Sequence, residues 1–407
     1  MTLRAIQVAC FLVLAACGSA PSANAGQAAG EPPFKISPVA TFDSPWAMAF
    51  LPGSSSALVT EKPGRVWLID VATGAKQPVS GAPKVVLSDQ GGLLDVVVSP
   101  RFAADRQLYL TYAEPSKNGG SGLALARATL TRARGAARLE NLKVLWRDPA
   151  GGEGGQFGAI VAFAPDGRSL FLTSGERQRF TPAQDPNQPL GKILHLTLDG
   201  KPAPGNPSAG QTGSATVTIT DPPRDTQAAK DAAGRKFTWP GPNLTPAETW
   251  ATGLRNPYGL AFDASGRLWE TEMGPRGGDE LNLIERGKNY GWPLVSEGEN
   301  YNGNPIPEHS SQGNFEPPKL SWVPSISPTS LLIYSGDLFP QWKGNGFIGA
   351  LSGKVLIRVI FNGESAKKAD QWDMGSRIRF VGQGPDGAIY LLEDGDGARL
   401  LMLTPAR

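Results

Sequence analysis

The 407-residue sequence holds only two cysteines and two histidines, and its positive and negative charges almost cancel. If Cys10 is removed with an N-terminal signal segment, one cysteine remains, which excludes an internal disulfide and a cysteine-based zinc site. The formal net charge is +2 and there is no block of Lys and Arg, so the electrostatic footprint of nucleic-acid binding is missing. After the N-terminus, no apolar run is long enough to span a bilayer.

Residues 1–16 have the features of an export signal. A short cationic start, Met1–Arg4, precedes an apolar run that ends in Leu14-Ala15-Ala16-Cys17. This ending resembles the lipobox of bacterial lipoproteins, which implies cleavage before Cys17, a diacylglyceryl group on its sulfur, and a periplasmic protein anchored to the cell envelope. Residues 17–35 are small and polar, and we predict a flexible tether there. Cleavage after Ala25, which would release a soluble periplasmic protein, is the alternative.

Glycine and proline are abundant, with 50 and 36 residues, and they punctuate a recurring strand–turn–strand unit. In each unit an apolar strand, a turn and a second apolar strand follow one another, and Asp-Gly or Ser-Gly pairs supply the positive φ that tight hairpin turns need. Six copies begin at Pro45, Leu94, Ala159, Tyr258, Ser330 and Ile378. The repeat predicts an all-β, six-bladed β-propeller over residues 36–407.

Turn spacing alone leaves a pair of β-sandwiches or a β-helix as alternatives to the propeller. Residues 201–249, rich in Pro, Gly and Asp, are predicted to be a surface insertion between the third and fourth units.

The glycine-rich segment 151–158 superficially suggests a dinucleotide-binding loop. No helix follows it and no strand–helix–strand unit surrounds it, so that interpretation is rejected.

Four motifs occur in order along the chain. They are Gln90 to Asp95, Leu254 to Phe262, Gly274 to Asn282 followed by Gly287 to Pro293, and Arg377-Ile378-Arg379. Together they resemble the glucose/sorbosone dehydrogenase family, most of all its periplasmic aldose sugar dehydrogenase branch. The resemblance implies pyrroloquinoline quinone (PQQ) and Ca²⁺ as cofactors, oxidation of aldose sugars or similar hydroxylated compounds at C1, and an electron acceptor in the envelope. Export also favours a tightly held redox group over a cytosolic nicotinamide cofactor.

PQQ is a planar tricarboxylate with a reactive quinone, so a site for it needs fixed cations. Alternation along a strand puts Arg377 and Arg379 on one face, and guanidinium forks suit carboxylates and quinone oxygens. The resemblance implies that Arg255 and Asn256 contact the quinone, with Arg255 stabilising charge that develops on the cofactor. A solvated strand face and a structural salt bridge are the alternatives for these arginines. The resemblance adds three further cofactor-binding positions: Gln90, Tyr301 and Thr329.

The acidic loop in the third motif is the candidate calcium region, because hard cations prefer carboxylate and carbonyl oxygens. The resemblance implies that the carbonyls of Gly274 and Pro275 hold the calcium that bridges to PQQ. It implies that Glu280 and Tyr290 hold a separate structural calcium. Ordinary loop charges are the alternative for the acidic residues, and Asp394-Gly395-Asp396-Gly397 is interpreted as a hairpin turn.

The segment Gly155 to Ile160 departs from the family pattern, which is roughly Asn-His-Phe-Gly-Gly-Arg. Its His is the general base that removes the C1-hydroxyl proton, but this chain has Gln156 there and Ile160 at the Arg position. An amide orients a hydroxyl but does not accept its proton near neutral pH. We therefore expect Gln90 and Gln156 to position the hydroxyl. Candidate bases are Glu153 and Glu176, and desolvation would raise the pKa of Glu176 into a useful range.

Other positions weaken the match or supply no base. His195 lies in an apolar strand and His309 in a Pro/Ser loop, and neither is interpreted as a base. A family lysine that contacts the cofactor is Ser352 here, with Lys354 two residues later, and Tyr258 replaces a common Gln. A non-catalytic propeller lipoprotein that binds sugar, quinone or a protein partner is therefore a second hypothesis. A lactonase is a third, less favoured because arginines rather than converging carboxylates are placed at the mouth.

Overall fold

The computed structural model describes residues 32–117, 119–133, 135–148, 150–214, 216–220, 234–239 and 241–406. The predicted signal segment, Cys17 and nearly all of the predicted tether lie outside the described residues. From Pro33 onward the chain forms one compact unit, and its first strand begins at Phe34. None of the helices in the described part is long and apolar enough to cross a membrane.

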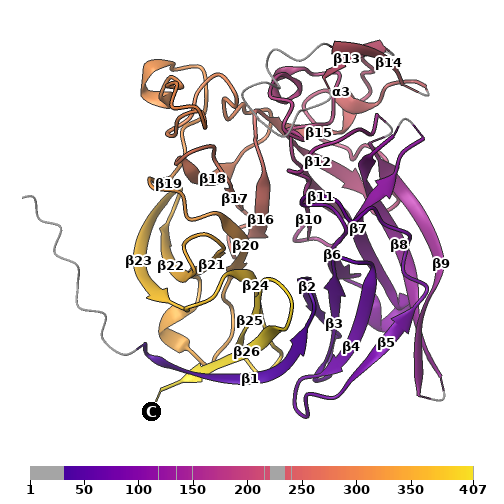
Figure 1. Cartoon of the computed structure of the whole chain (residues 1–407), viewed down its shortest axis with the longest axis vertical. Coiled ribbons are helices and arrows are strands. Elements are labelled where there is room, and N and C mark those ends of the chain that lie inside the picture. Colours follow the sequence, from indigo (N-terminus) through magenta and orange to yellow (C-terminus); the bar gives the residue numbers. More distant parts are fainter. Residues whose placement is uncertain are drawn as a thin grey trace, which may run out of the picture. The chain divides into compact units, whose positions relative to one another are not determined.

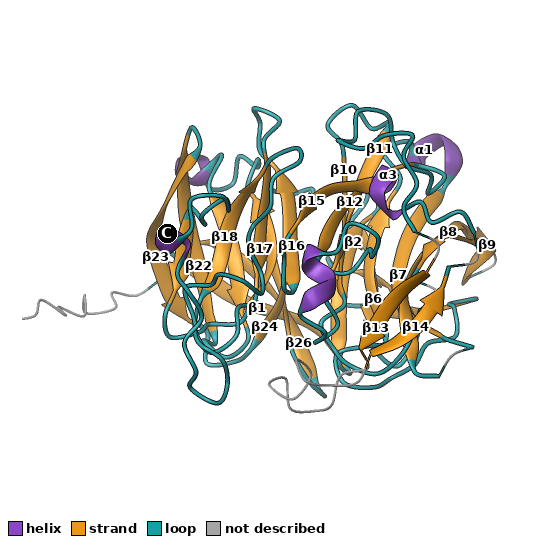
Figure 2. Cartoon of the chain, turned by 90° about the horizontal axis from the view of Figure 1, so that it is seen from above, coloured by secondary structure: helices purple, strands orange, loops and turns teal. Residues whose placement is uncertain are grey.

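The described strands confirm the prediction of an all-β chain (Figures 1 and 2). One eight-stranded sheet consists of two antiparallel meanders that are joined only by a short parallel pairing of β5 with β9. The first meander is β2 (Pro45–Phe50), β3 (Ser56–Glu61), β4 (Arg65–Asp70) and β5 (Lys76–Ser80). The second is β6 (Leu93–Val98), β7 (Gln107–Pro115), β8 (Ser121–Ala133) and β9 (Ala136–Arg147).

Four further sheets have four antiparallel strands each. One contains β10 (Gly158–Phe163), β11 (Ser169–Ser174), β12 (Lys192–Thr197) and β15 (Thr249–Thr252). The next contains β16 (Pro257–Phe262), β17 (Leu268–Glu272), β18 (Asp279–Ile284) and β19 (Leu320–Trp322). A third contains β20 (Pro328–Ile333), β21 (Gly346–Ala350), β22 (Val355–Asn362) and β23 (Ser365–Asp373). The last joins the two ends of the described chain, since β1 (Phe34–Phe42) pairs with β26 (Ala398–Pro405) beside β25 (Ile389–Glu393) and β24 (Ile378–Gln383).

The inner strands of these units form a closed ring. Each of β2, β6, β10, β16, β20 and β24 contacts the next, and β24 contacts β2. In Figure 1 their labels surround the centre of the ribbon. Side chains from all six line one axial channel of about 370 Å³, most of it apolar. This ring places the ends of six sheets around a common axis.

Buried threonines link neighbouring four-stranded units, the two meanders of the eight-stranded sheet counting as two units, and explain part of the sequence repeat. In four units, a threonine in the second strand donates its hydroxyl to a backbone carbonyl in the inner strand of the next unit. All four of these threonines are fully buried. The donor–acceptor pairs are Thr60 with Leu94 (2.6 Å), Thr111 with Ala159 (2.7 Å), Thr173 with Pro257 (3.0 Å) and Thr271 with Thr329 (2.9 Å). Because a buried hydroxyl without a partner is costly, each bond favours one relative placement of two units.

The predicted insertion at 201–249 lies between two strands of one sheet rather than between two sheets, because β12 pairs directly with β15. Its described part contains the hairpin β13 (Thr216–Thr220) and β14 (Gly234–Thr238) and the short helix α3 (Thr245–Glu248), at the top of Figure 1. The remaining helical turns are α1 (Phe102–Asp105), η1 (Thr181–Gln184), η2 (His309–Ser311) and η3 (Pro340–Trp342).

Candidate active site

A small cavity of about 100 Å³, here called the mouth pocket, lies at one end of the axial channel. Trp46, Tyr258 and Arg379 line both the pocket and the channel, so they form the boundary between the two. The rings of Trp46 and Tyr258 have centroids 5.8 Å apart, and the Arg379 guanidinium lies 6.0 Å from the Tyr258 centroid. The mouth pocket is completed by Lys62, Gln90, Met273, Leu351 and Arg377.

Gln90, which precedes β6, connects three parts of the site through one amide oxygen. Its Oε1 accepts hydrogen bonds from the backbone N–H of Gln156 (3.0 Å), the hydroxyl of Tyr258 (3.1 Å) and Nδ2 of Asn256 (3.4 Å). These donors come from segments around β10 and β16, so the contact exists only because the sheets form a ring. With the oxygen saturated, the Nε2 group of Gln90 is the atom available to a ligand in the pocket.

Arg255 is buried and held in place through both its backbone and its guanidinium group. Its backbone N–H donates to Glu272 Oε2 at 2.6 Å, and the N–H of Asn256 donates to the same oxygen at 3.2 Å. The Arg255 guanidinium donates to the carbonyls of Met273 (2.9 Å) and Gly274, and it lies 3.4 Å from the hydroxyl of Tyr301. Tyr301 is 54% exposed and therefore covers the arginine from the solvent side.

Gln156 joins Arg255 to Glu176. In the amide orientation that satisfies both of its polar atoms, Gln156 Oε1 accepts from Arg255 at 2.8 Å and Nε2 donates to Glu176. All three side chains are at most 4% exposed. Burial raises the pKa of Glu176, against the opposing influence of the Arg255 charge and of the backbone N–H of Phe180. Glu153, the other candidate base, is exposed and has no such contact with Gln156.

The loop that carries Gln156 is fixed by Arg177. Its guanidinium donates to the carbonyls of Gly154 (2.8 Å) and Gly155 (3.1 Å) and lies 3.8 Å from the ring centroid of Phe157. Burial lowers the pKa of Arg177 to about 9, which leaves it cationic at neutral pH. Gln156 itself has φ +56°, in the left-handed region. The buried cation and the stacked ring hold this conformation, which non-glycine residues adopt less readily.

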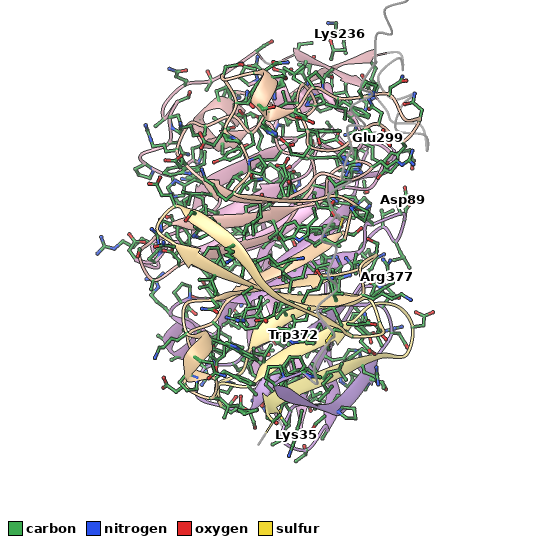
Figure 3. All side chains as sticks on the ribbon, turned by 90° about the vertical axis from the view of Figure 1, so that its left-hand side faces the viewer. Lys35, Asp89, Lys236, Glu299, Trp372 and Arg377 are labelled. Atoms are coloured by element: carbon green, nitrogen blue, oxygen red, sulfur yellow. The ribbon has the colours of Figure 1, made fainter. Side chains whose placement is uncertain are left out.

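On the other side of the mouth pocket, Arg377 and Arg379 share one carboxylate. Arg379 donates through two nitrogens to Asp394 Oδ1 (2.8 and 2.9 Å), and Arg377 donates to Asp394 Oδ2 (2.9 Å). Both arginines therefore face one side, although Arg377 (labelled in Figure 3) lies just before β24 and the register of that strand shifts between Ile378 and Phe380. Burial would raise the pKa of Asp394, but the Arg379 charge and the hydrogen bonds from both arginines hold it below its usual range.

Four expected cofactor positions do not line the mouth pocket: Arg255, Asn256, Tyr301 and Thr329. The hydroxyl of Thr329 lies 3.0 Å from the carbonyl of Gly349 and 3.1 Å from that of Ile378, and its side chain lines the axial channel instead. Lys354 is exposed and does not line the pocket. Ser352 is bonded to Ser327 (Oγ–Oγ 2.8 Å).

The four candidate metal residues, Gly274, Pro275, Glu280 and Tyr290, line a single cavity of about 10 Å³. A cavity of this size has room for about one water-sized particle. Within the described ranges, no three His, Cys, Asp or Glu side chains already converge with metal-binding geometry. The donors are nevertheless oxygens, of the kind that Ca²⁺ takes.

Two buried carboxylates, Glu272 and Glu280, line this cavity, and the Asn282 amide bonds both Glu280 and Glu270. Burial raises the pKa of Glu272 to about 7 and also raises the pKa of Glu270 and Glu280. Among the described residues, Glu270 Oε1 and Asn282 Oδ1 are buried without a hydrogen-bond partner. Arg255 also lines the cavity, so a hard cation there would share these carboxylates with one fixed positive charge and would favour their ionised form.

Some of these residues had no signal in the sequence. Lys62 and Trp46 belong to no motif, and they reach the mouth pocket from the first meander. Asp394 was assigned only to a hairpin turn; it does begin that turn, and its carboxylate also anchors both arginines. Glu272 could have been noticed, because it is the last residue of β17 and shortly precedes the loop that carries Gly274.

An all-β chain whose inner strands enclose a channel, with a polar site at one end, is of the β-propeller type. This chain belongs to the glucose/sorbosone dehydrogenase family, whose sequence profile matches residues 42–239 and 241–402. It is 35% identical over 370 residues to the aldose sugar dehydrogenase YliI of Escherichia coli (strain K12), covering 89% of this chain and 90% of that protein.

Solved structures agree with this assignment. The apo-form of the soluble aldose sugar dehydrogenase from E. coli has a TM-score of 0.78 and 34% identity, covering 92% of this chain and 100% of that chain. The PQQ-bound aldose sugar dehydrogenase from Streptomyces coelicolor has a TM-score of 0.67 and 27% identity, covering 92% of this chain and 99% of that chain. The family resemblance predicted from the four motifs is confirmed.

Proposed function

We propose that this chain is a PQQ- and Ca²⁺-dependent dehydrogenase that oxidises aldose sugars, or similar hydroxylated compounds, at C1. Electrons then pass to an acceptor in the cell envelope. The observation that carries the proposal is the buried chain Glu176–Gln156–Arg255 beside the mouth pocket, with Gln90 linking both. When bound, PQQ supplies the two-electron acceptor for the hydride that leaves C1.

The residues present fit an anionic quinone. Arg377 and Arg379 offer guanidinium groups, and among the described residues Arg255 Nε is buried without a hydrogen-bond partner. Such an unpaired buried donor is costly, and an acceptor oxygen of a ligand would satisfy it. Asn256 and Gln90 add amide groups that bind neutral oxygens. Tyr301, half exposed above Arg255, would pack on the ring from the open side.

The proton from the C1 hydroxyl needs an acceptor other than Gln156. We assign this role to Glu176, whose carboxylate bonds to the Gln156 amide and whose pKa is raised by burial. A raised pKa makes a carboxylate a better proton acceptor near neutral pH. Gln156 and Gln90 orient the hydroxyl, and the fixed charge of Arg255 stabilises negative charge that develops nearby.

One Ca²⁺ is assigned to the cavity lined by Gly274, Pro275, Glu280 and Tyr290, in place of the two separate ions that the family resemblance implies, because the four residues line one small cavity. Its oxygen donors support a hard cation. The carbonyl of Gly274 already accepts from Arg255, and its second lone pair remains for a cation. Bound there, the ion would offset the charge of the buried carboxylates and fix the loop that carries Arg255.

The architecture behind this site is, in our proposal, a six-bladed propeller. The four four-stranded sheets and the two halves of the eight-stranded sheet are the blades, and the β1–β26 pairing closes the ring. The sequence Leu14 to Cys17 supports a lipid anchor on Cys17 and a periplasmic location, with a soluble periplasmic form as the alternative. A sugar and an envelope electron acceptor are the partners.

A second function is a non-catalytic one, in which the same mouth binds a sugar, a quinone or a protein partner. Gln156 at the position of the family's His is the observation that favours it. Loss of a general base lowers a rate by about 10²–10⁴-fold. If Glu176 does not compensate, binding without turnover remains.

Dye reduction by the purified mature protein tests the proposal. The protein is incubated with Ca²⁺ and PQQ and offered a panel of aldoses. We expect activity that needs both additions. PQQ binding without turnover of any sugar would establish the binding protein instead, and failure to bind PQQ would refute the dehydrogenase and any quinone-binding role.

A further inference from the structure

Lys62, which belongs to none of the motifs, is positioned as part of the mouth pocket. It lies in the turn between β3 and β4, and its backbone is bonded to a neighbour on each side. Its N–H donates to the carbonyl of Ser44 (3.0 Å), and its carbonyl accepts from the N–H of Leu93 (2.9 Å). These bonds tie the turn to β2 and β6, so the start of the side chain has a fixed place in the ring.

The ammonium group of Lys62 has spare donors. Within the part of the chain that the structure describes, its one hydrogen bond goes to the carbonyl of Asp89 at 3.3 Å. An ammonium group carries three donors, so two remain for a ligand. The side chain is half-buried among Trp46, Gln90 and Arg379, which all line the same cavity.

The charges at the mouth pocket do not balance. Lys62, Arg377 and Arg379 are three cations, and Asp394 is the one carboxylate that bonds to the arginines. The carboxylate of Asp89 is exposed to solvent, which screens its attraction. Burial and the nearby Arg379 charge lower the pKa of Lys62, as expected for a cation crowded by another. An anion with several carboxylates would relieve this crowding.

We propose that Lys62 is a cofactor-binding residue that pairs with a carboxylate of PQQ in the mouth pocket. The inference rests on the proposed function and adds a residue to it. Lys62 would also supply the positive charge that is missing at Ser352, where the family has a lysine. Lys354 is close in sequence but exposed and outside the pocket, whereas Lys62 is distant in sequence and lines it.

Equilibrium dialysis of PQQ against the Ca²⁺-loaded mature protein, without sugar, tests this directly. We expect Lys62→Gln to weaken PQQ binding by about 10- to 100-fold, the loss typical of one charge-assisted hydrogen bond. Lys62→Arg should recover most of that loss. Lys354→Gln is the matched control, because it removes an exposed lysine, and it should leave PQQ binding unchanged. Thermal unfolding of each variant checks that the fold is retained.

The trimethyl ester of PQQ separates a charge contact from a general effect on the pocket. The ester keeps the ring system but lacks the carboxylates, so Lys62→Gln should weaken binding of PQQ and leave binding of the ester unchanged. An equal loss for both ligands would overturn the proposal and make Lys62 a structural residue. Wild-type affinity for PQQ in Lys62→Gln would overturn it while the proposed function stands. If the wild type itself does not bind PQQ, the proposed function fails as well.

Discussion

Two groups of residues are built in opposite ways at the mouth pocket: the cations of one line it, and the other is joined to it through Gln90. On one side, here called the cation side, Lys62, Arg377, Arg379 and Asp394 lie partly in solvent, and the Arg377 side chain is 45% exposed. On the other, the amide side, Gln156, Glu176 and Arg255 form a buried chain. Guanidinium groups stay charged in water and need only a fixed fork to bind an anion. A carboxylate that takes a proton near neutral pH needs desolvation. The cation side is therefore suited to binding and the amide side to proton transfer. The replacement of the family's His by Gln156 lies on the amide side.

The largest expected effect comes from restoring the imidazole with Gln156→His. Measured in the Glu176→Gln background, where the proposed base is absent, kcat for an aldose should rise by about 10²–10⁴-fold, the usual contribution of a general base. The backbone at Gln156 is left-handed, a conformation in which His is found more often than most residues. PQQ affinity should not change, because the cation side is untouched. Gln156→Asn, which keeps an amide, is the control for steady-state kinetics. An unchanged kcat in Gln156→His would show that the amide side does not limit turnover.

Glu176→Gln tests the amide side from its buried end. We expect kcat to fall by roughly 10²-fold, since the substitution keeps the shape but removes the proton acceptor. Burial raises the pKa of Glu176, so activity of the wild type should increase with pH as this group ionises, at a pH above the usual value for Glu. The variant should lose that inflection in its pH–rate profile. Glu153→Gln, at an exposed position, should keep both rate and inflection; full activity in Glu176→Gln would exclude Glu176 as the base.

The two arginines of the cation side differ in solvent exposure, and substituting each in turn should show whether exposure sets its contribution to PQQ binding. Arg379 is 11% exposed and bonds Asp394 through two nitrogens, whereas Arg377 uses one. Arg379→Gln should weaken PQQ binding by about tenfold or more, as expected for a charge-assisted contact shielded from water. Arg377→Gln should cost only about two- to fivefold, because exposed ion pairs contribute little. Equilibrium dialysis of PQQ ranks the two. Equal losses would mean that exposure does not set the contribution of each arginine.

Much of the fold could be predicted because its determinants are local. Alternating apolar residues and Asp-Gly turns specify a hairpin wherever they occur, and threonines such as Thr111 and Thr173 recur in the second strand of four units. Pairings over long distances in sequence left no such pattern. The strand β15 joins β12 across the insertion, so the sequence did not show that the insertion interrupts a sheet.

The same contrast between local and long-range determinants applies to the residues of the site. Residues within a motif, such as Arg255 and Asn256, could be named because neighbours in the sequence fix their surroundings. Lys62 and Asp394 could not, since each meets its partners only when separate sheets come together around the axis. The bond between Gln156 and Glu176 is intermediate: position suggested Glu176, and only the folded loop shows that the two side chains touch.

Calcium should have the smallest effect on PQQ affinity and should act on the amide side alone. Glu272 holds the backbone of Arg255 and Asn256, and it lines the same small cavity as Glu280. At a Ca²⁺ concentration about 100 times its dissociation constant, a ligand that binds only the folded state adds about 2.7 kcal/mol to the free energy of unfolding. We expect a stabilisation of this order in thermal unfolding with Ca²⁺ compared with a chelator.

Glu280→Gln should abolish this stabilisation, because it removes one anionic ligand, while the exposed Glu364→Gln should retain it. If Ca²⁺ stabilises Glu280→Gln as much as the wild type, the ion binds elsewhere. The comparison of the two sides becomes sharper if chelation lowers kcat more than it lowers PQQ affinity. That result would follow if the ion positions Arg255 through its loop and leaves Arg377 and Arg379 in place. Equal losses of kcat and of PQQ affinity would show that the ion supports both sides together.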